Sequence, residues 1–320
     1  MIYNSEPVNL SRIDFPDQTC RISTRKDIQS LADSIKGTGL ISPLLLLEKE
    51  GGRLSLISGF RRAEACKFLN RTEAEGRILA KDTPFSDCIR YAITENAFQR
   101  ALNPIEISRS FRLLQKQYDD EELLANAAAG LGLPGNRAAV RQLLPLCGLS
   151  SRIQEGILQE IISPIMALEL AGLDAEIADR LAALFCDLRV SLNKQREILN
   201  LVREIALRDD LEMPDVLEDR NMTDILSDPE KDRNQKTRQI RLYLRKCRFP
   251  AISAAEERYA ECVKELKLPK GLRLIPPKDF EGSVFCFQLY FSSIKELEYV
   301  LTQLELSYKT PAFGQIIKNC

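Results

Sequence analysis

Histidine and tryptophan are absent from the 320 residues of the chain. Without histidine there is no imidazole to transfer protons, to activate a serine or cysteine nucleophile, or to bind a metal. The nine cysteines include no CxxC pair, which argues against a zinc site. Their odd number and scattered spacing suit a reducing compartment. These absences exclude the common histidine-dependent enzyme mechanisms.

Long apolar runs are also missing, since none approaches the roughly 20 residues that a membrane-spanning helix needs. The first residues, MIYNSEPVNLSRID, lack a basic region followed by an apolar core, so we expect no signal peptide. The composition, 44% apolar and 28% charged, is typical of a folded globular protein. We expect two or three domains in the cytoplasm, with no membrane partner.

The net charge of −1 hides an uneven distribution. Residues 1–118 contain 18 Lys or Arg and 14 Asp or Glu, whereas residues 119–213 contain 9 and 16. Residues 230–248, EKDRNQKTRQIRLYLRKCR, contain 8 and 2. This basic tract is therefore the main electrostatic feature for an acidic partner. Its candidate DNA contacts are Lys236, Arg238, Arg241 and Arg245.

The stretch Leu54–Leu69, LSLISGFRRAEACKFL, predicts a strand, a turn at Ser58-Gly59 and the start of a helix. A helix start exposes free N–H groups and the positive end of the helix dipole. Arg61 and Arg62 in the first turn are unfavourable there unless an anion such as phosphate binds between them. The alternative is a solvated arginine pair beside a tight turn, and this pattern alone favours neither.

A second polar stretch runs from Thr94 to Arg100. On a continuous helix, Glu95 and Gln99 would share one face, and Asn96 and Arg100 would share another. A carboxylate suits Mg²⁺, and a guanidinium suits phosphate. The sequence Asn103-Pro104-Ile105-Glu106 predicts a new helix with Asn103 as its N-cap.

Three motifs in this order resemble those of ParB-type chromosome and plasmid partition proteins. They are Leu31–Ile35 with Gly39–Pro43, then Gly59–Arg62 with Ala65, then Glu95–Arg100 with Asn103–Glu106. The resemblance covers about the first two thirds of the chain. It implies a mixed α/β domain of the ParB/sulfiredoxin-like fold, which binds CTP with Mg²⁺ and acts as a switch. It also implies that a helical, helix-turn-helix DNA-binding domain follows.

The resemblance also implies site residues. The nucleotide-binding candidates are Gly39, Pro43, Gly59, Phe60, Arg61, Arg62, Ala65, Glu95, Asn96, Gln99 and Arg100, with Glu95 as the Mg²⁺ ligand. The family usually has a glutamate, associated with hydrolysis, where this chain has Phe60. Hydrolysis of CTP is therefore left open, and no catalytic residue is assigned.

Residues 105–213 are almost wholly helical by their periodicity. A helix from Leu123 meets a break at Pro134-Gly135, and a short helix follows from Asn136 to Leu144. This pattern fits a helix-turn-helix, although a plain helical hairpin has the same pattern and the acidity of the segment disfavours strong nonspecific DNA affinity. The candidate base-reading or phosphate-contacting residues are Asn136, Arg137, Arg141 and Gln142.

The expected organisation is a nucleotide-binding domain (1–104), a helix-turn-helix domain (105–213), an acidic linker (214–235) and a small α+β domain (236–320). In the last, residues 240–245 fit a strand or a helix equally well. Residues 252–266 and 294–304 predict helices, and residues 272–275 and 284–291 predict a hairpin.

We therefore expect a nucleoid-associated DNA-binding protein of chromosome or plasmid partition, homodimeric, with a partition ATPase among its partners. One alternative is a transcriptional regulator that keeps the fold without nucleotide switching. The other is an ATP-using enzyme of the sulfiredoxin fold. Sulfiredoxins, however, carry Cys and His just before the phosphate-turn arginine, where this chain has Gly59 and Phe60.

Overall fold

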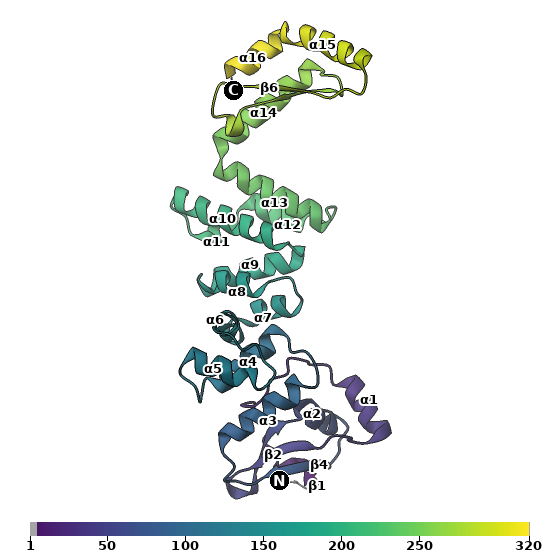
Figure 1. Cartoon of the computed structure of the whole chain (residues 1–320), viewed down its shortest axis with the longest axis vertical. Coiled ribbons are helices and arrows are strands. Elements are labelled where there is room, and N and C mark those ends of the chain that lie inside the picture. The colour runs from purple at the N-terminus through teal and green to yellow at the C-terminus, as the bar shows by residue number, and fades with distance from the viewer. Residues whose placement is uncertain (1–4, 320) are drawn as a thin grey trace. The chain divides into compact units, whose positions relative to one another are not determined.

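The computed structural model describes residues 5–319. The chain divides into two compact units, Met1–Leu192 and Asn193–Cys320, and each is described by itself below. The first unit contains a four-stranded sheet followed by helices, and the second contains helices and a two-stranded sheet. Figure 1 labels most of these helices and strands along the chain.

The large sheet consists of β1 (Glu6–Asn9), β2 (Leu44–Glu48), β3 (Leu54–Ser58) and β4 (Glu73–Leu79), in the order β1-β4-β2-β3. β2 pairs with β4 in parallel, and the other pairs are antiparallel. Every residue of β3 is buried. The mixed α/β character predicted for this region is confirmed. The alternating pattern of β4 was not recognised in the sequence.

Three helices pack with this sheet: α1 (Gln29–Thr38), α2 (Phe60–Phe68) and α3 (Phe85–Ala97). Figure 1 shows α2 and α3 beside the strands. Gly39 ends α1 with a φ of +80°, which a residue without a Cβ adopts readily. The core combines aliphatic residues of the strands with Ala32, Ile35 and Ile93 from the helices. This packing fixes the β3–α2 turn against the end of α3.

The rest of the first unit is helical, as its periodicity predicts. The helices are α4 (Pro104–Leu114), α5 (Glu121–Ala129), α6 (Arg137–Leu143), α7 (Ser151–Leu158), α8 (Pro164–Ala171) and α9 (Ala175–Leu188). Asn103 and Glu106 form the expected capping box of α4. Asp120 and Asn136 cap α5 and α6 with their side-chain oxygens.

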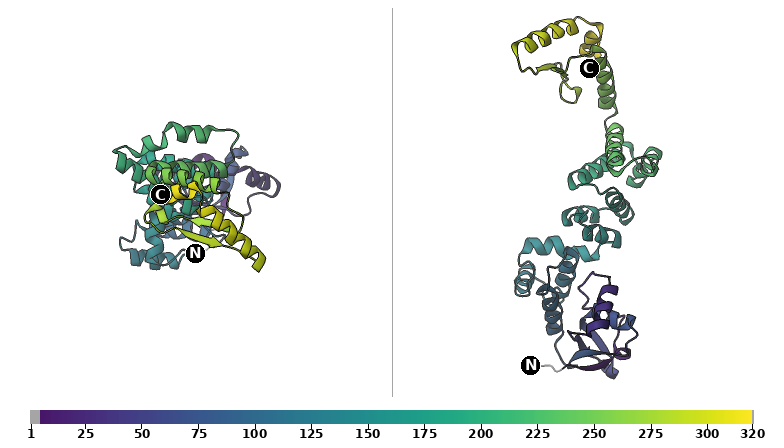
Figure 2. Two further views of the ribbon diagram at one scale, coloured as in Figure 1. Left: turned by 90° about the horizontal axis from the view of Figure 1, so that it is seen from above. Right: turned by 90° about the vertical axis from the view of Figure 1, so that its right-hand side faces the viewer.

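The second unit begins with helices and ends with a hairpin and two more helices. They are α10 (Leu192–Asp209), α11 (Met213–Leu217), α12 (Arg220–Ser227), α13 (Arg233–Arg248), α14 (Pro250–Leu266), β5 (Leu272–Ile275), β6 (Cys286–Leu289), α15 (Ile294–Tyr308) and α16 (Pro311–Asn319). The antiparallel β5–β6 hairpin was expected. The views in Figure 2 show the yellow C-terminal helices of this unit.

One feature of this unit differs from expectation, and one alternative left open in the sequence is resolved. The segment expected to be a linker, residues 214–235, contains α11 and α12, because Val216 and Met222 are buried and anchor them. Residues 240–245 are helical, which settles the alternative left open in the sequence. Ile240 and Leu244, four residues apart, are both fully buried on one side of α13. Among residues 5–319, no helix is long and apolar enough to cross a membrane.

Candidate functional site

The turn between β3 and α2 has the predicted strand–glycine–helix form. Gly59 has a φ of +92°. A Cβ at this position would lie 3.0 Å from Leu44 Cδ2 and 3.2 Å from Arg62 Nη2. The positive φ favours glycine, and the nearby ends of Leu44 and Arg62 would have to shift to admit a Cβ. Since α2 starts at the next residue, its free N–H groups lie at this turn.

A cavity of about 430 Å³ adjoins this turn, and we call it the first cavity. Eight of the eleven nucleotide-binding candidates line it: Gly59, Phe60, Arg61, Arg62, Glu95, Asn96, Gln99 and Arg100. The other three do not. Gly39 caps α1, Pro43 lines a neighbouring cavity, and Ala65 is fully buried in the core. The structure thus brings residues of the second and third motifs together at one cavity, which Leu31 of the first motif also lines.

The two adjacent arginines have different roles. Arg62 pairs with the Glu95 carboxylate and donates to the carbonyls of Ser42 (2.8 Å) and Pro43 (3.0 Å). Arg61 Nη2 donates to the Asp27 carbonyl, while Arg61 Nε is buried and has no hydrogen-bond partner in the described chain. That both arginines flank an anion stays a prediction, since both line the first cavity. Arg62 is occupied by the protein, because Glu95 and two carbonyls lie within its reach.

Glu95 has the complementary feature, since its Oε2 is also buried without a partner among the described residues. The side-chain amide of the adjacent Asn96 donates to the Ala92 carbonyl (2.8 Å), which fixes its orientation. Buried polar atoms are nearly always hydrogen-bonded in folded proteins. An unused donor and an unused acceptor beside one cavity therefore indicate a place where a ligand makes polar contacts.

The lining of the first cavity is strongly positive. Arg25, Arg61, Arg62 and Arg100 line it, with Glu95 as the one acidic residue among those that line it within residues 5–319. Arg25 was missed in the sequence. The signal that would have found it is the pair of cations, Arg25 and Lys26, directly before the first helix.

The geometry of the third motif, Glu95–Arg100, differs from the prediction. α3 ends at Ala97, so Gln99 and Arg100 lie beyond the helix and do not extend the faces begun by Glu95 and Asn96. Arg100 instead turns toward α4, where its two Nη atoms lie 2.7 Å from the two carboxylate oxygens of Glu106. The ion pair with a residue of the next helix, not helical spacing, places Arg100.

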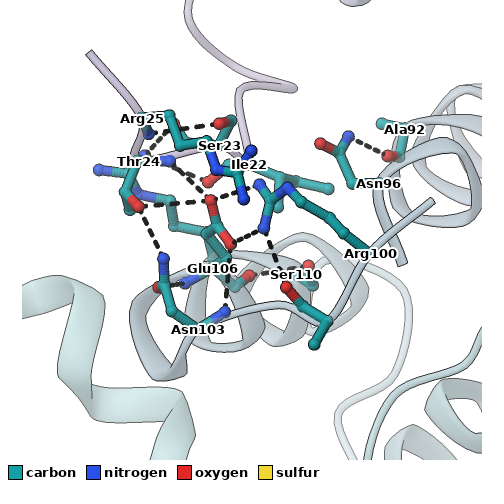
Figure 3. Close-up of polar contacts among 12 residues, drawn as sticks. Ile22, Ser23, Thr24, Arg25, Ala92, Asn96, Arg100, Asn103, Glu106 and Ser110 are labelled. Carbon is teal, nitrogen blue, oxygen red and sulfur yellow. Dashed lines mark hydrogen bonds and ion pairs between the residues drawn. The ribbon is translucent and has the colours of Figure 1, made fainter. Parts of the chain in front are cut away.

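Glu106 is the centre of a buried polar network (Figure 3). Its side chain is fully buried and accepts from Arg100, from the Thr24 N–H (2.9 Å) and from the Asn103 N–H (3.1 Å). Burial alone would raise the pKa of Glu106, but these hydrogen bonds outweigh it and hold the pKa below its ordinary value. The network ties Arg100, and the segment of Thr24 whose neighbours Ser23 and Arg25 line the first cavity, to the start of α4.

The helix-turn-helix candidates lie on α6 and its N-cap. Asn136 is occupied as the cap, accepting from the Ala139 N–H (2.8 Å). Arg141 pairs with Glu121 at 2.7 Å, and Arg137 lies 3.6 Å from Glu122. Arg137 and Arg141 remain exposed, whereas Gln142 is half-buried. The arginines face carboxylates at the start of α5, with which a DNA phosphate or base would compete.

The basic tract lies on α13, where internal partners compensate part of its charge. Arg241 pairs with Glu197 and Arg245 with Glu256, while Lys236 donates to the Leu226 carbonyl. Within residues 5–319, Arg238 has no such partner. The tract is therefore less available to an external acidic partner than its composition suggests, because carboxylates of α10 and α14 lie beside it.

Comparison with known proteins finds similarity to one family over part of the chain. Residues 4–97 match the family described as ParB N-terminal domain. The probable chromosome-partitioning protein ParB of Helicobacter pylori is 32% identical over 162 residues, which are 50% of this chain and 53% of that protein. A nucleoid occlusion protein of Geobacillus kaustophilus is 30% identical over 146 residues, 46% of this chain and 50% of that protein. This chain thus spans about half the length of the curated relatives it matches.

Two solved structures of the C-terminally truncated ParB of Caulobacter crescentus are also similar. The complex with CTP-γ-S matches with a TM-score of 0.27 and 21% identity, covering 57% of this chain and 99% of that one. The complex with the centromeric parS site matches with a TM-score of 0.32 and 17% identity, covering 56% and 98%. At TM-scores this low, the two structures add no argument about this chain.

Proposed function

We propose that this chain is a nucleotide-dependent DNA-binding protein of chromosome or plasmid partition, which the match of residues 4–97 to the ParB N-terminal domain family supports. The first cavity would bind CTP with Mg²⁺, and binding would reorganise the N-terminal domain and favour its self-association. The α5–α6 pair would supply DNA recognition. CTP is the nucleotide that the resemblance of the motifs implies.

One observation carries the proposal: Arg61 Nε and Glu95 Oε2 are both buried and unpartnered, and both residues line one arginine-rich cavity next to a helix start. A triphosphate brings acceptor oxygens for Arg25 and Arg61, which form no ion pair within residues 5–319, and for the N–H groups of α2. The volume of about 430 Å³ lies within the usual range for small-molecule sites. A nucleoside triphosphate therefore satisfies the charge, the unused donor and the size together.

The residues present also fit Mg²⁺. Among residues 5–319, no cluster of three His, Cys, Asp or Glu side chains could hold a metal by itself. Mg²⁺ is commonly bound by one or two carboxylates together with phosphate oxygens and water. The unpartnered Oε2 of Glu95 is suited to be that carboxylate ligand. When bound, the ion would neutralise phosphate charge, while Arg62 holds Glu95 in place.

We expect Glu95→Gln to weaken nucleotide binding in Mg²⁺ and to leave the Mg²⁺-free component unchanged. The substitution keeps the shape of the side chain but removes the anionic ligand. Calorimetric titration with and without Mg²⁺ measures both components. Glu75→Gln, on the exposed side of β4, is the matched control. An unchanged Mg²⁺ dependence in Glu95→Gln would mean that Glu95 only holds Arg62.

Titrating ATP, CTP, GTP and UTP into the purified protein, with and without Mg²⁺, tests the function itself. CTP-selective binding supports the switch. ATP selectivity would favour a sulfiredoxin-type reaction, and no binding would favour a regulator that keeps the fold as a scaffold. Hydrolysis is a separate measurement, since Phe60 is buried and provides no carboxylate at the position of the family's glutamate.

For DNA we expect a division of labour between α6 and α13. Arg137→Ala with Arg141→Ala should reduce discrimination between specific and random DNA, because placed donors read base edges. Replacing Lys236, Arg238, Arg241 and Arg245 by alanine should weaken binding to specific DNA and to random DNA. It should also reduce the slope of log affinity against log salt concentration by about 0.9 for each phosphate that the protein no longer neutralises. Binding to both DNAs across a salt series measures each effect. A wild-type slope in the second variant would mean that α13 does not touch DNA, in line with its internal ion pairs.

A further inference from the structure

A second cavity of about 680 Å³ lies in the first unit, between the segment of residues 18–26 and α4. We call it the basic cavity, because five of the residues that line it are cationic: Arg21, Lys26, Arg109, Arg112 and Lys116. None of the residues that line it within the described chain is Asp or Glu. The functional assignment made above uses none of these five residues.

Three of the cations come from one face of a single helix and its end. Arg109, Arg112 and Lys116 are three and four residues apart, the spacing that superimposes side chains along α4 and the turn after it. Arg21 and Lys26 approach from the facing segment. The segment of residues 18–26 and α4, which are far apart in the sequence, thus both place cationic side chains around the basic cavity.

Internal acids compensate only one of these charges. Arg21 pairs with Glu64. Arg109 donates to the carbonyls of Ile22 (3.3 Å) and Ser23 (3.0 Å), and Lys116 Nζ lies 5.4 Å from the centre of the Phe85 ring. Within residues 5–319, Lys26, Arg109, Arg112 and Lys116 form no ion pair. The nearby carboxylate of Glu106 is held by Arg100.

Concentrating like charges in this way is unfavourable without a counter-ion. Arg109 is half-buried, and burial lowers its pKa, with the positive charge of Arg21 adding to that effect. The contacts of Arg21 and Arg109 stabilise the packing of this segment, but they leave the repulsion among the cations, which a bound anion would relieve. Guanidinium groups bind phosphate oxygens in a two-pronged manner, and a lysine adds a mobile point charge.

We propose that the basic cavity binds a small anion that carries phosphate groups, at a site separate from the nucleotide in the first cavity. Its volume is within the range of small-molecule sites, and its concave form suits a free phosphorylated molecule better than a DNA backbone. Ser23 lines both cavities, so the two sites share one wall. The proposal does not depend on nucleotide binding and stands if that fails.

The test uses inorganic pyrophosphate as the probe and the full-length chain. Since pyrophosphate can also enter the first cavity, the titration is made in Arg61→Ala protein. There, adding Arg112→Ala and Lys116→Ala should weaken binding by at least about tenfold, the effect of removing one or more charge-assisted hydrogen bonds. Adding Lys36→Ala and Arg90→Ala, two exposed cations that line neither cavity, should change it less than about twofold.

Two outcomes overturn the proposal. In the first, Arg61→Ala protein binds no pyrophosphate. In the second, adding Arg112→Ala and Lys116→Ala leaves pyrophosphate binding as tight as adding Lys36→Ala and Arg90→Ala does. Cys147 gives an independent readout without mutation, because this half-buried thiol lines the basic cavity. Pyrophosphate should slow alkylation of Cys147 and leave the exposed Cys286 unaffected, as measured by mass spectrometry. Random duplex DNA added as a competitor identifies the source of the phosphate. Displacement of pyrophosphate indicates the DNA backbone, and its retention indicates a free ligand.

Discussion

Replacing Glu106 by alanine is expected to lower the free energy of unfolding around α4 by about 3–5 kcal/mol, the effect of removing one partner of a buried ion pair. Glu106 is fully buried, and its carboxylate satisfies Arg100 and the N–H groups of Thr24 and Asn103. Alanine leaves these donors without an acceptor and removes half of the capping box. Because the chain has two units, hydrogen exchange of α4 peptides measures the local change better than one global transition.

The matched control is Glu122→Ala, an exposed carboxylate in the first turn of α5, which should change stability by less than about 1 kcal/mol.

The stability difference between the wild type and Glu106→Gln should depend on pH. The pKa of Glu106 is lowered in the folded protein, so its ionised carboxylate stabilises the fold above the unfolded pKa of about 4.3. That stabilisation is lost as the pH falls through the lower, folded pKa. The difference between wild type and Glu106→Gln should thus be constant near neutral pH and vanish in acid; a pH-independent difference would contradict this role.

Arg61→Ala is expected to weaken nucleotide binding by roughly 10- to 100-fold, corresponding to about 1.5–3 kcal/mol for one charge-assisted hydrogen bond, while the fold survives. Arg61 lines the first cavity and keeps a buried Nε without a partner, so its loss removes a donor that the protein itself does not use. Direct titration of CTP with Mg²⁺ measures the affinity, and thermal unfolding checks the fold.

Arg90→Ala, an exposed arginine of α3 that does not line the cavity, is the control of equal charge. Arg62→Ala is less informative, because it also releases Glu95 and the carbonyls of Ser42 and Pro43. We expect that variant to lose both affinity and stability. If Arg61→Ala binds CTP as tightly as Arg90→Ala does, the phosphates lie elsewhere.

Local sequence determined the elements on which the candidate site is built. The run from Leu54 to Leu69 specifies a buried strand, a glycine turn and a helix, because apolar alternation, a residue without Cβ and strong helix formers follow one another. The capping box at Asn103 and Glu106 is equally local. Both were predictable, since each depends on contacts within a few residues.

Other outcomes depended on partners remote in the sequence. Their adjacent positions predict the same anion-binding role for Arg61 and Arg62. In the structure, Glu95, 33 residues after Arg62, forms an ion pair with Arg62, whereas Arg61 keeps an unused donor. Helical spacing joined Arg100 to Asn96, but α3 ends at Ala97 and Glu106 draws Arg100 away. The composition of the basic tract predicts a positively charged surface, but Glu197 and Glu256 compensate part of its charge.

The basic cavity also depends on the tertiary structure. Only folding brings the segment of residues 18–26 against α4, so that five cations separate in the sequence line one cavity. The electrostatic effect of a charged side chain depends on the groups that surround it in space. Tertiary packing determines those groups, and the local sequence does not encode it.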